Sequence, residues 1–282
     1  LVNNVGDPPA GYTGRGVIVG TIDTGIDHTH ADFKKADGSS RILYIWDHQR
    51  EGSAPAGYSY GYEYTKAMID GGRANQHVDQ GAHGTHVAGI AAGDGSSFAD
   101  HRFRGVAWEA DIIAVRNGGS CDVFCYGGGV PPWDRGDLYG HNGGTKGSID
   151  GLNYMIAKAK TLRKPLVVNQ SQGVGKGPHD GTTLFEQAYN QLVTDPQKNL
   201  IICIAAGNEQ QMASHGRAAV PAGGSASFTI SKTWSSTQGD VTNNYMDFEC
   251  WYPAGKQIRW ELEAPGGEIV AVPASIPAGE YP

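Results

Sequence analysis

The sequence predicts an α/β fold in which a parallel sheet has helices on both faces and is followed by the start of an antiparallel β module. Two observations lead to this prediction. Short β-branched runs alternate with longer helical patterns before residue 224, an order typical of βαβ units. Beyond that residue, short alternating runs follow one another without helical patterns, as in antiparallel sheets. We therefore expect a first domain at 1–223 and an incomplete β-rich insertion at 224–282.

Four apolar runs are the expected strands of the parallel sheet. Each is short and rich in β-branched residues, the pattern of a strand buried on both faces. They are GVIVGTID ending at Asp23, ADIIAVR at 110–116, PLVVNQS at 165–171 and LIICIAAG at 200–207. Cys203 lies inside the last run, so we expect its thiol to be buried.

Helical patterns and two long connections separate these runs. Helices are expected for HGTHVAGIAA from 83, GSIDGLNYMIAKAKTLR from 147 and TLFEQAYNQLVTD from 183. Residues 34–80 and 117–146 are expected to be long loops of the kind that are functional or mobile, and RILYIWDHQ and GYSYGYEYT indicate an ordered flap in the first. The second contains Cys121 and Cys125, close enough for a loop disulfide, which favours a secreted or exported protein.

Composition narrows the classes of partner. The chain has 282 residues and a net charge of −7, and it shows no cluster of Lys and Arg of the kind that binds phosphates. The composition therefore argues against a general nucleic-acid-binding surface. No apolar run approaches the roughly 20 residues of a membrane span, so we expect no membrane span.

Three polar side chains follow or precede apolar runs: Asp23, His83 and Asn208. A carboxylate, an imidazole and a carboxamide can orient a base, move a proton and stabilise an oxyanion. Each also has a simpler interpretation. Asp23 is compatible with a turn carboxylate, His83 with a metal ligand beside His86, and Asn208 with a helix cap.

Taken together, TIDTGID, HGTHVAGIAAG, VVNQSQG and AAGNE resemble four of the five signature blocks of the subtilisin-like serine proteases, in the family's order over about residues 12–222. The resemblance implies a subtilisin-like sheet and serine protease chemistry. It makes Asp23 the residue that orients the imidazole, His83 the general base and Asn208 the oxyanion donor, with His86 a structural neighbour and no metal ligands.

The same resemblance implies the residues that bind substrate. Ser171, Gln172 and Gly173 match the strand that lines the primary specificity pocket. Gln172 stands where the family usually has Leu, which leaves an apolar neighbouring subsite in question. Glu209 borders the pocket, so a basic residue before the scissile bond is expected to be preferred.

The fifth block, Gly-Thr-Ser-x-Ala, does not occur in the sequence. The resemblance therefore implies a serine endopeptidase acting on polypeptides whose nucleophile lies outside this chain, on a C-terminal fragment. The alternative is a pseudoprotease that serves as a peptide-binding or activating scaffold. No cofactor is required, and structural calcium is compatible with the family. RILYIWD (41–47) and GNEQQMASHG (207–216) further resemble stretches of the clostridial germination proteases, which carry a β-module insertion.

Overall fold

The computed structural model describes residues 12–79, 81–118, 144–172, 177–194, 199–208, 215–230 and, with short gaps, 250–271. The chain divides into two compact units, one formed by 1–175 and 184–245 and the other by 176–183 and 246–282. Each unit is described separately. Within the described ranges, no helix combines the length and apolar character needed to cross a bilayer.

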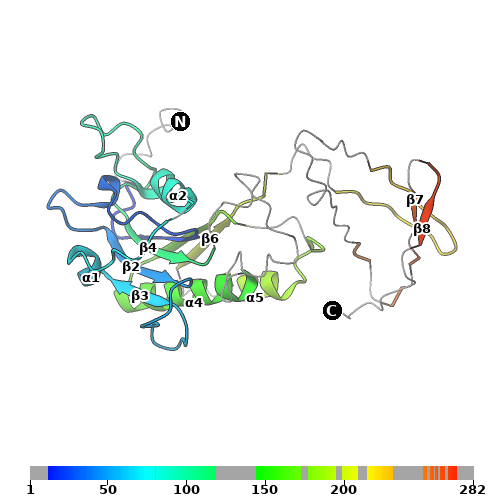
Figure 1. The fold of residues 1–282 in the computed structure, drawn as a ribbon, viewed down its shortest axis with the longest axis horizontal. Coiled ribbons are helices and arrows are strands. Elements are labelled where there is room, and N and C mark those ends of the chain that lie inside the picture. The colour runs from blue at the N-terminus through cyan, green and yellow to red at the C-terminus, as the bar shows by residue number, and fades with distance from the viewer. Residues whose placement is uncertain are drawn as a thin grey trace. The chain divides into compact units, whose positions relative to one another are not determined.

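The first unit is built on a mostly parallel sheet (Figure 1). The strands, in the spatial order β3-β2-β4-β1-β5-β6, are β3 (Tyr62–Thr65), β2 (Ile42–Asp47), β4 (Asp111–Arg116), β1 (Ile18–Asp23), β5 (Leu166–Gln170) and β6 (Leu200–Ile204). Only β3 is antiparallel to its described neighbour. The four strands predicted from the apolar runs are confirmed, with β1 at the centre of the sheet.

Helices cover both faces of this sheet, as predicted. Helices α4 (Gly144–Leu162) and α5 (Leu184–Val193) lie along one face, and α2 (His83–Ala92) lies on the other (Figure 1). The alternation of side chains along β1 sends Ile18 and Ile22 into the core with α4, whereas Val19 packs with α2. Because strand side chains alternate in direction, Asp23 belongs to the α2 face.

The expectation that residues 34–80 form a loop with a flap is wrong. They contain strands β2 and β3 and helix α1 (Lys66–Asp70), and η2 (Ala31–Phe33) lies just before them. The run ILYIWD pairs in parallel with β4, and its Ile42, Ile45 and Trp46 are fully buried. An apolar aromatic run of six residues is long enough for a sheet strand, and burial on both faces stabilises it there.

The expectation of a buried Cys203 is also wrong, since its thiol is exposed. Strand β6 pairs with β5, but 60% of Ile201 and 49% of Ile204 are accessible to solvent. An apolar sequence in a parallel strand normally has both faces covered. The apolar surface of β6 is therefore available for packing. Cys121 and Cys125 lie outside the described residues.

The second unit contains a short antiparallel pair, β7 (Glu261–Glu263) with β8 (Ile269–Ala271). This agrees with the antiparallel pattern expected after residue 224. Upstream, in the first unit, the described residues 227–230 lie outside any strand, and Phe228 and Ile230 are exposed, so the alternating pattern expected after residue 224 forms no strand in these four residues. The domain boundary at 223/224 stays a prediction.

Candidate active site

The carboxyl ends of the parallel strands bring the candidate residues to one edge of the sheet. Asp23 is the last residue of β1, and His83 is the first residue of α2. They are 60 residues apart in the sequence. Ligand sites of open α/β sheets form at the carboxyl edge of the strands, which is where the two blocks meet.

Asp23 and His83 form a hydrogen-bonded pair. The Nδ1 atom of His83 lies 2.7 Å from Oδ1 of Asp23. An ionised carboxylate only accepts, so Nδ1 donates this hydrogen bond, and in the neutral imidazole Nε2 then has a free lone pair. The Asp23 side chain is 1% exposed and that of His83 is 42% exposed. An acid buried behind a solvent-facing imidazole is the arrangement that a general base requires.

Burial raises the pKa of the Asp23 carboxyl above its ordinary value, because it outweighs the hydrogen bonds from His83 and Thr24 that favour the ionised form. Its Oδ1 accepts from the Thr24 backbone N–H at 2.7 Å as well as from His83. Its Oδ2 is buried without a partner among the described residues. The carboxylate therefore has one oxygen committed to orienting the imidazole.

Gly84 allows the first turn of α2 to approach the end of β1. A Cβ atom at this position would lie 2.1 Å from the Gly25 carbonyl oxygen and 3.0 Å from Cβ of Asp23. Any side chain would therefore push the helix away from the strand. The glycine after His83 is required for the distance between base and acid.

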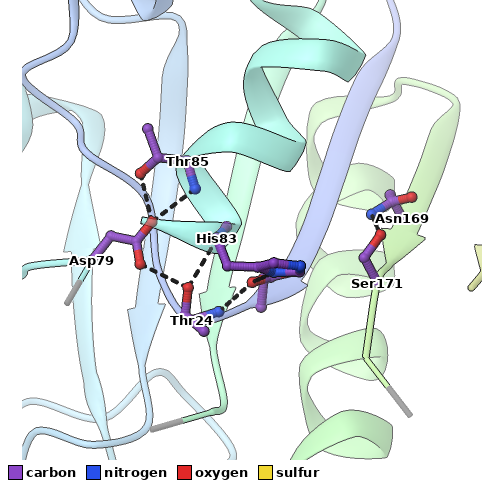
Figure 2. Close-up of polar contacts among 8 residues, drawn as sticks. Thr24, Asp79, His83, Thr85, Asn169 and Ser171 are labelled. Carbon is purple, nitrogen blue, oxygen red and sulfur yellow. Dashed lines mark hydrogen bonds and ion pairs between the residues drawn. The ribbon is translucent and has the colours of Figure 1, made fainter. Parts of the chain in front are cut away.

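A second polar cluster, absent from the sequence analysis, joins the same two elements (Figure 2). The Asp79 carboxylate accepts from the Thr24 hydroxyl at 2.7 Å and from the Thr85 backbone N–H at 2.8 Å. The Thr85 hydroxyl also donates to Asp79, at 2.6 Å. In the sequence, the signal for this cluster is a threonine shortly after each catalytic candidate: Thr24 after Asp23 in DTG, and Thr85 after His83 in HGTH. We name Thr24, Asp79 and Thr85 the threonine clamp.

Behind this edge, a buried network joins β4, β5 and the helices beneath them. The Ser148 hydroxyl accepts from the side-chain amides of Asn117 and Gln170, each at 3.0 Å, and the Tyr189 hydroxyl donates to Gln170. The Asn117 backbone N–H donates to the Asp23 carbonyl at 3.1 Å. These bonds hold the strand that carries Asp23 in register with its neighbours.

The expected substrate-binding strand follows β5. Ser171 accepts from the side-chain amide of Asn169 at 2.9 Å, and Figure 2 shows both residues separate from the His83 pair. A Cβ atom at Gly118 would lie 2.8 Å from Nε2 of Gln172, so the Gln172 side chain lies near the end of β4. Gly173 is outside the described residues.

Asn208 lies four residues beyond the end of β6, after Gly207 in a left-handed conformation with φ of 94°. It is exposed, and within the described ranges its side chain makes no hydrogen bond to His83. The structure therefore brings Asp23 and His83 together, whereas Asn208 follows β6 and, among the described residues, makes no hydrogen bond to either of them. Glu209 is outside the described residues.

A second histidine–aspartate pair lies nearby but is enclosed. His77 Nδ1 lies 2.8 Å from Oδ2 of Asp47, and the two side chains are 0% and 1% exposed. His77 Nε2 accepts from the Ile26 backbone N–H at 3.3 Å, and Arg116 pairs with the same carboxylate. Both ring nitrogens are occupied, so this pair fixes the position of the segment before α2.

The alternative interpretation of His83 and His86 as metal ligands lacks a further ligand among the described residues. His86 is exposed on α2, and Nδ1 of His83 is already bonded to Asp23. Across the described ranges, no group of three or more His, Cys, Asp or Glu side chains is placed to hold a metal ion. Structural calcium stays a prediction.

Comparison with known proteins identifies relatives of one kind. The Subtilase family model, Peptidase_S8, matches residues 14–280. Subtilisin-like protease 4 of Trichophyton tonsurans is 29% identical over 261 residues, 92% of this chain and 46% of that protein. Its namesake in Arthroderma gypseum is 30% identical with the same coverage. The chain thus spans about half the length of these relatives.

Among solved structures, the Clostridium perfringens CspB protease is similar, with a TM-score of 0.57 and 32% sequence identity. The match covers 72% of this chain and 38% of that one. This likeness is in line with the narrower resemblance to clostridial proteases. It confirms the α/β fold class.

Proposed function

Because the chain belongs to the subtilase family, we propose that it forms the base-bearing part of a serine endopeptidase that hydrolyses peptide bonds in polypeptides. One observation carries the proposal: the 2.7 Å hydrogen bond between the buried Asp23 and the solvent-facing His83. The bond leaves Nε2 of His83 as the basic atom. A nucleophile activated by an adjacent, oriented base is the general requirement of this chemistry.

In the proposed mechanism, Nε2 of His83 accepts the proton of a serine hydroxyl as that oxygen attacks the substrate carbonyl. Asp23 stabilises the imidazolium that forms. The Asn208 side-chain amide donates to the oxyanion of the tetrahedral intermediate. Ser171, Gln172 and Gly173 bind the substrate beside the reacting bond. No cofactor takes part.

The proposed nucleophile lies on a C-terminal part of the protein, because the chain has no Gly-Thr-Ser-x-Ala segment. The exposed apolar residues of β6, Ile201 and Ile204, support this assignment. Covering them would bury surface worth about 25 cal/mol per Å². Because β6 is the strand that leads to Asn208, a segment packed on β6 would also lie beside the strand that positions this residue.

The test uses the complete natural polypeptide and its His83→Ala variant. A fluorophosphonate probe should label the wild type and abolish its peptide hydrolysis, and the variant should lose at least about 10⁴-fold in kcat. His86→Ala is the matched control, because that exposed imidazole lies one turn further along α2. It should retain activity.

Equal rates of peptide hydrolysis by wild type and His83→Ala would refute the proposed serine endopeptidase activity. The absent nucleophile block favours a second candidate, the pseudoprotease. A complete polypeptide that binds peptides but neither reacts with the probe nor hydrolyses them would support that alternative.

Glu209 is proposed to favour a basic side chain before the scissile bond. An exposed carboxylate gives a modest preference that salt weakens. Peptide-library profiling of wild type and Glu209→Gln tests this, and an unchanged Lys-to-Phe preference would contradict it.

Structural calcium is tested by measuring the Tm with and without a chelator. Export of the protein is tested by locating it in fractionated cultures.

A further inference from the structure

Helix α2 begins without a capping side chain of its own. Its N-cap residue is Ala82, which has a left-handed φ of 52° and no side-chain hydrogen bond to the helix. The first N–H groups of a helix lack intrahelical partners and need acceptors from elsewhere. A helix that presents a catalytic imidazole from its first residue therefore depends on acceptors outside it.

The threonine clamp supplies these acceptors. The Gly84 N–H donates to the Thr24 hydroxyl at 3.0 Å, and the Thr85 N–H donates to the Asp79 carboxylate at 2.8 Å. Asp79 thus caps the helix from four residues before His83, and its negative charge suits the positive end of the helix dipole. Thr24 caps the same turn from the end of β1.

Each member of the clamp is also attached to the strand side of the site. The Thr24 backbone N–H donates to Oδ1 of Asp23, the oxygen that holds His83. The Asp27 N–H donates to the Thr85 hydroxyl at 2.8 Å. A Cβ atom at Gly25 would lie 3.2 Å from the Asp79 Cα, so the backbone bearing Asp79 packs directly on the turn after β1.

We propose that Asp79 is a positioning residue: it holds the first turn of α2 against the end of β1 and so fixes the His83 imidazole on Asp23. The His83 side chain is 42% exposed, so packing alone does not define its orientation. Figure 2 shows Thr24 and Asp79 bonded to the first turn of α2, the turn from which His83 projects. This proposal rests on the proposed function of His83 as the base.

The test compares Asp79→Asn with wild type in the complete natural polypeptide. The Asn side chain keeps one acceptor oxygen but places an NH₂ group near the N–H and O–H donors of Thr24 or Thr85. Because a displacement of about 1 Å at a reacting group can cost about 100-fold in rate, kcat should fall about 10- to 100-fold. KM should stay within about two-fold of the wild-type value, since substrate contacts are unchanged.

Two further variants separate positioning from a loss of stability. Thr85→Val removes the hydroxyl and should lower kcat, whereas Thr85→Ser keeps it and should restore activity. Asp37→Asn is the matched control: Asp37 is exposed and its carboxylate accepts from the Ser39 N–H in a turn before β2. This variant should leave kcat unchanged.

An NMR measurement reads the geometry without using activity. The Nδ1–H resonance of His83, assigned with His83→Ala, should be sharp in wild type and Asp37→Asn and broadened or absent in Asp79→Asn. Such a change in a complete polypeptide that lacks serine hydrolase activity would uphold the positioning and refute the proposed function. Folded Asp79→Asn or Thr85→Val that keeps both the resonance and kcat would overturn the positioning while the proposed function stood.

Discussion

Gly84 allows a direct test of how closely α2 must approach β1. In Gly84→Ala the new methyl group would lie 2.1 Å from the Gly25 carbonyl oxygen, whereas carbon–oxygen contacts in proteins are about 3.3–3.6 Å. The helix start or the turn must therefore move by about 1 Å. The methyl carbon is fixed by the backbone of residue 84 and the oxygen it meets is a backbone atom, so no side-chain rotation relieves the contact.

The expected cost follows from two opposing effects. Overpacking costs up to about 3 kcal/mol, and replacing glycine by alanine within a helix returns about 1 kcal/mol. Gly84→Ala should therefore lower the free energy of unfolding by about 2 kcal/mol and the Tm by about 4–8 °C. The displacement of His83 from Asp23 should lower kcat by about 100-fold.

Gly89→Ala is the matched control. Gly89 lies in the same helix, and a Cβ atom there meets nothing within 4 Å. This variant should gain about 1 kcal/mol, raise the Tm by about 2–4 °C and keep its activity. The assay is thermal unfolding with hydrolysis kinetics on the complete polypeptide. Equal Tm and kcat in the two variants would refute the close approach as the reason for glycine.

Further predictions concern a buried acid, an exposed thiol and a strained residue. Although burial opposes ionisation, the hydrogen bond from His77 and the charge of Arg116 hold the pKa of Asp47 below its ordinary value. A lowered folded-state pKa adds stability that is present above about pH 4 and lost as pH falls through that pKa. Asp47→Asn should lower the Tm by several degrees at pH 7, and the difference should shrink below about pH 4; a constant difference would contradict this. Cys203 should react with iodoacetamide in the 282-residue chain and be protected at least about ten-fold in the complete polypeptide, measured by peptide mass spectrometry with exposed Cys250 for comparison; equal labelling would argue against packing on β6. Ala82→Gly should raise the urea midpoint, because releasing a left-handed alanine is worth about 1 kcal/mol, and a lower midpoint would show that its φ of 52° is not strained.

Much of the fold and the central pair was predictable from local sequence. The runs that became β1, β4, β5 and β6, and the patterns that became α2, α4 and α5, are each contiguous and periodic. Parallel strands align their carboxyl ends at one edge. The meeting of Asp23 with His83 follows from that rule and from the family blocks, and the 2.7 Å bond agrees with it.

Other features depended on which surfaces pack together. Strand β2 was expected to be a flap, because its aromatic run lies among turn residues, yet its side chains are buried in the sheet. Cys203 was expected to be buried, because burial was inferred from the composition of its own strand. Whether a strand face is covered is decided by other segments, which a local pattern does not specify.

The threonine clamp shows most directly what the tertiary structure decided. Thr24 and Asp79 are 55 residues apart, and Asp and Thr beside a turn are compatible with local capping or solvent exposure. By itself, the sequence predicted the two elements that carry the site, β1 and α2, and that Asp23 and His83 lie at their ends. Only the packing of α2 on β1 decided which distant side chains satisfy the first N–H groups of the helix, because hydrogen bonds act over about 3 Å in space regardless of separation along the chain.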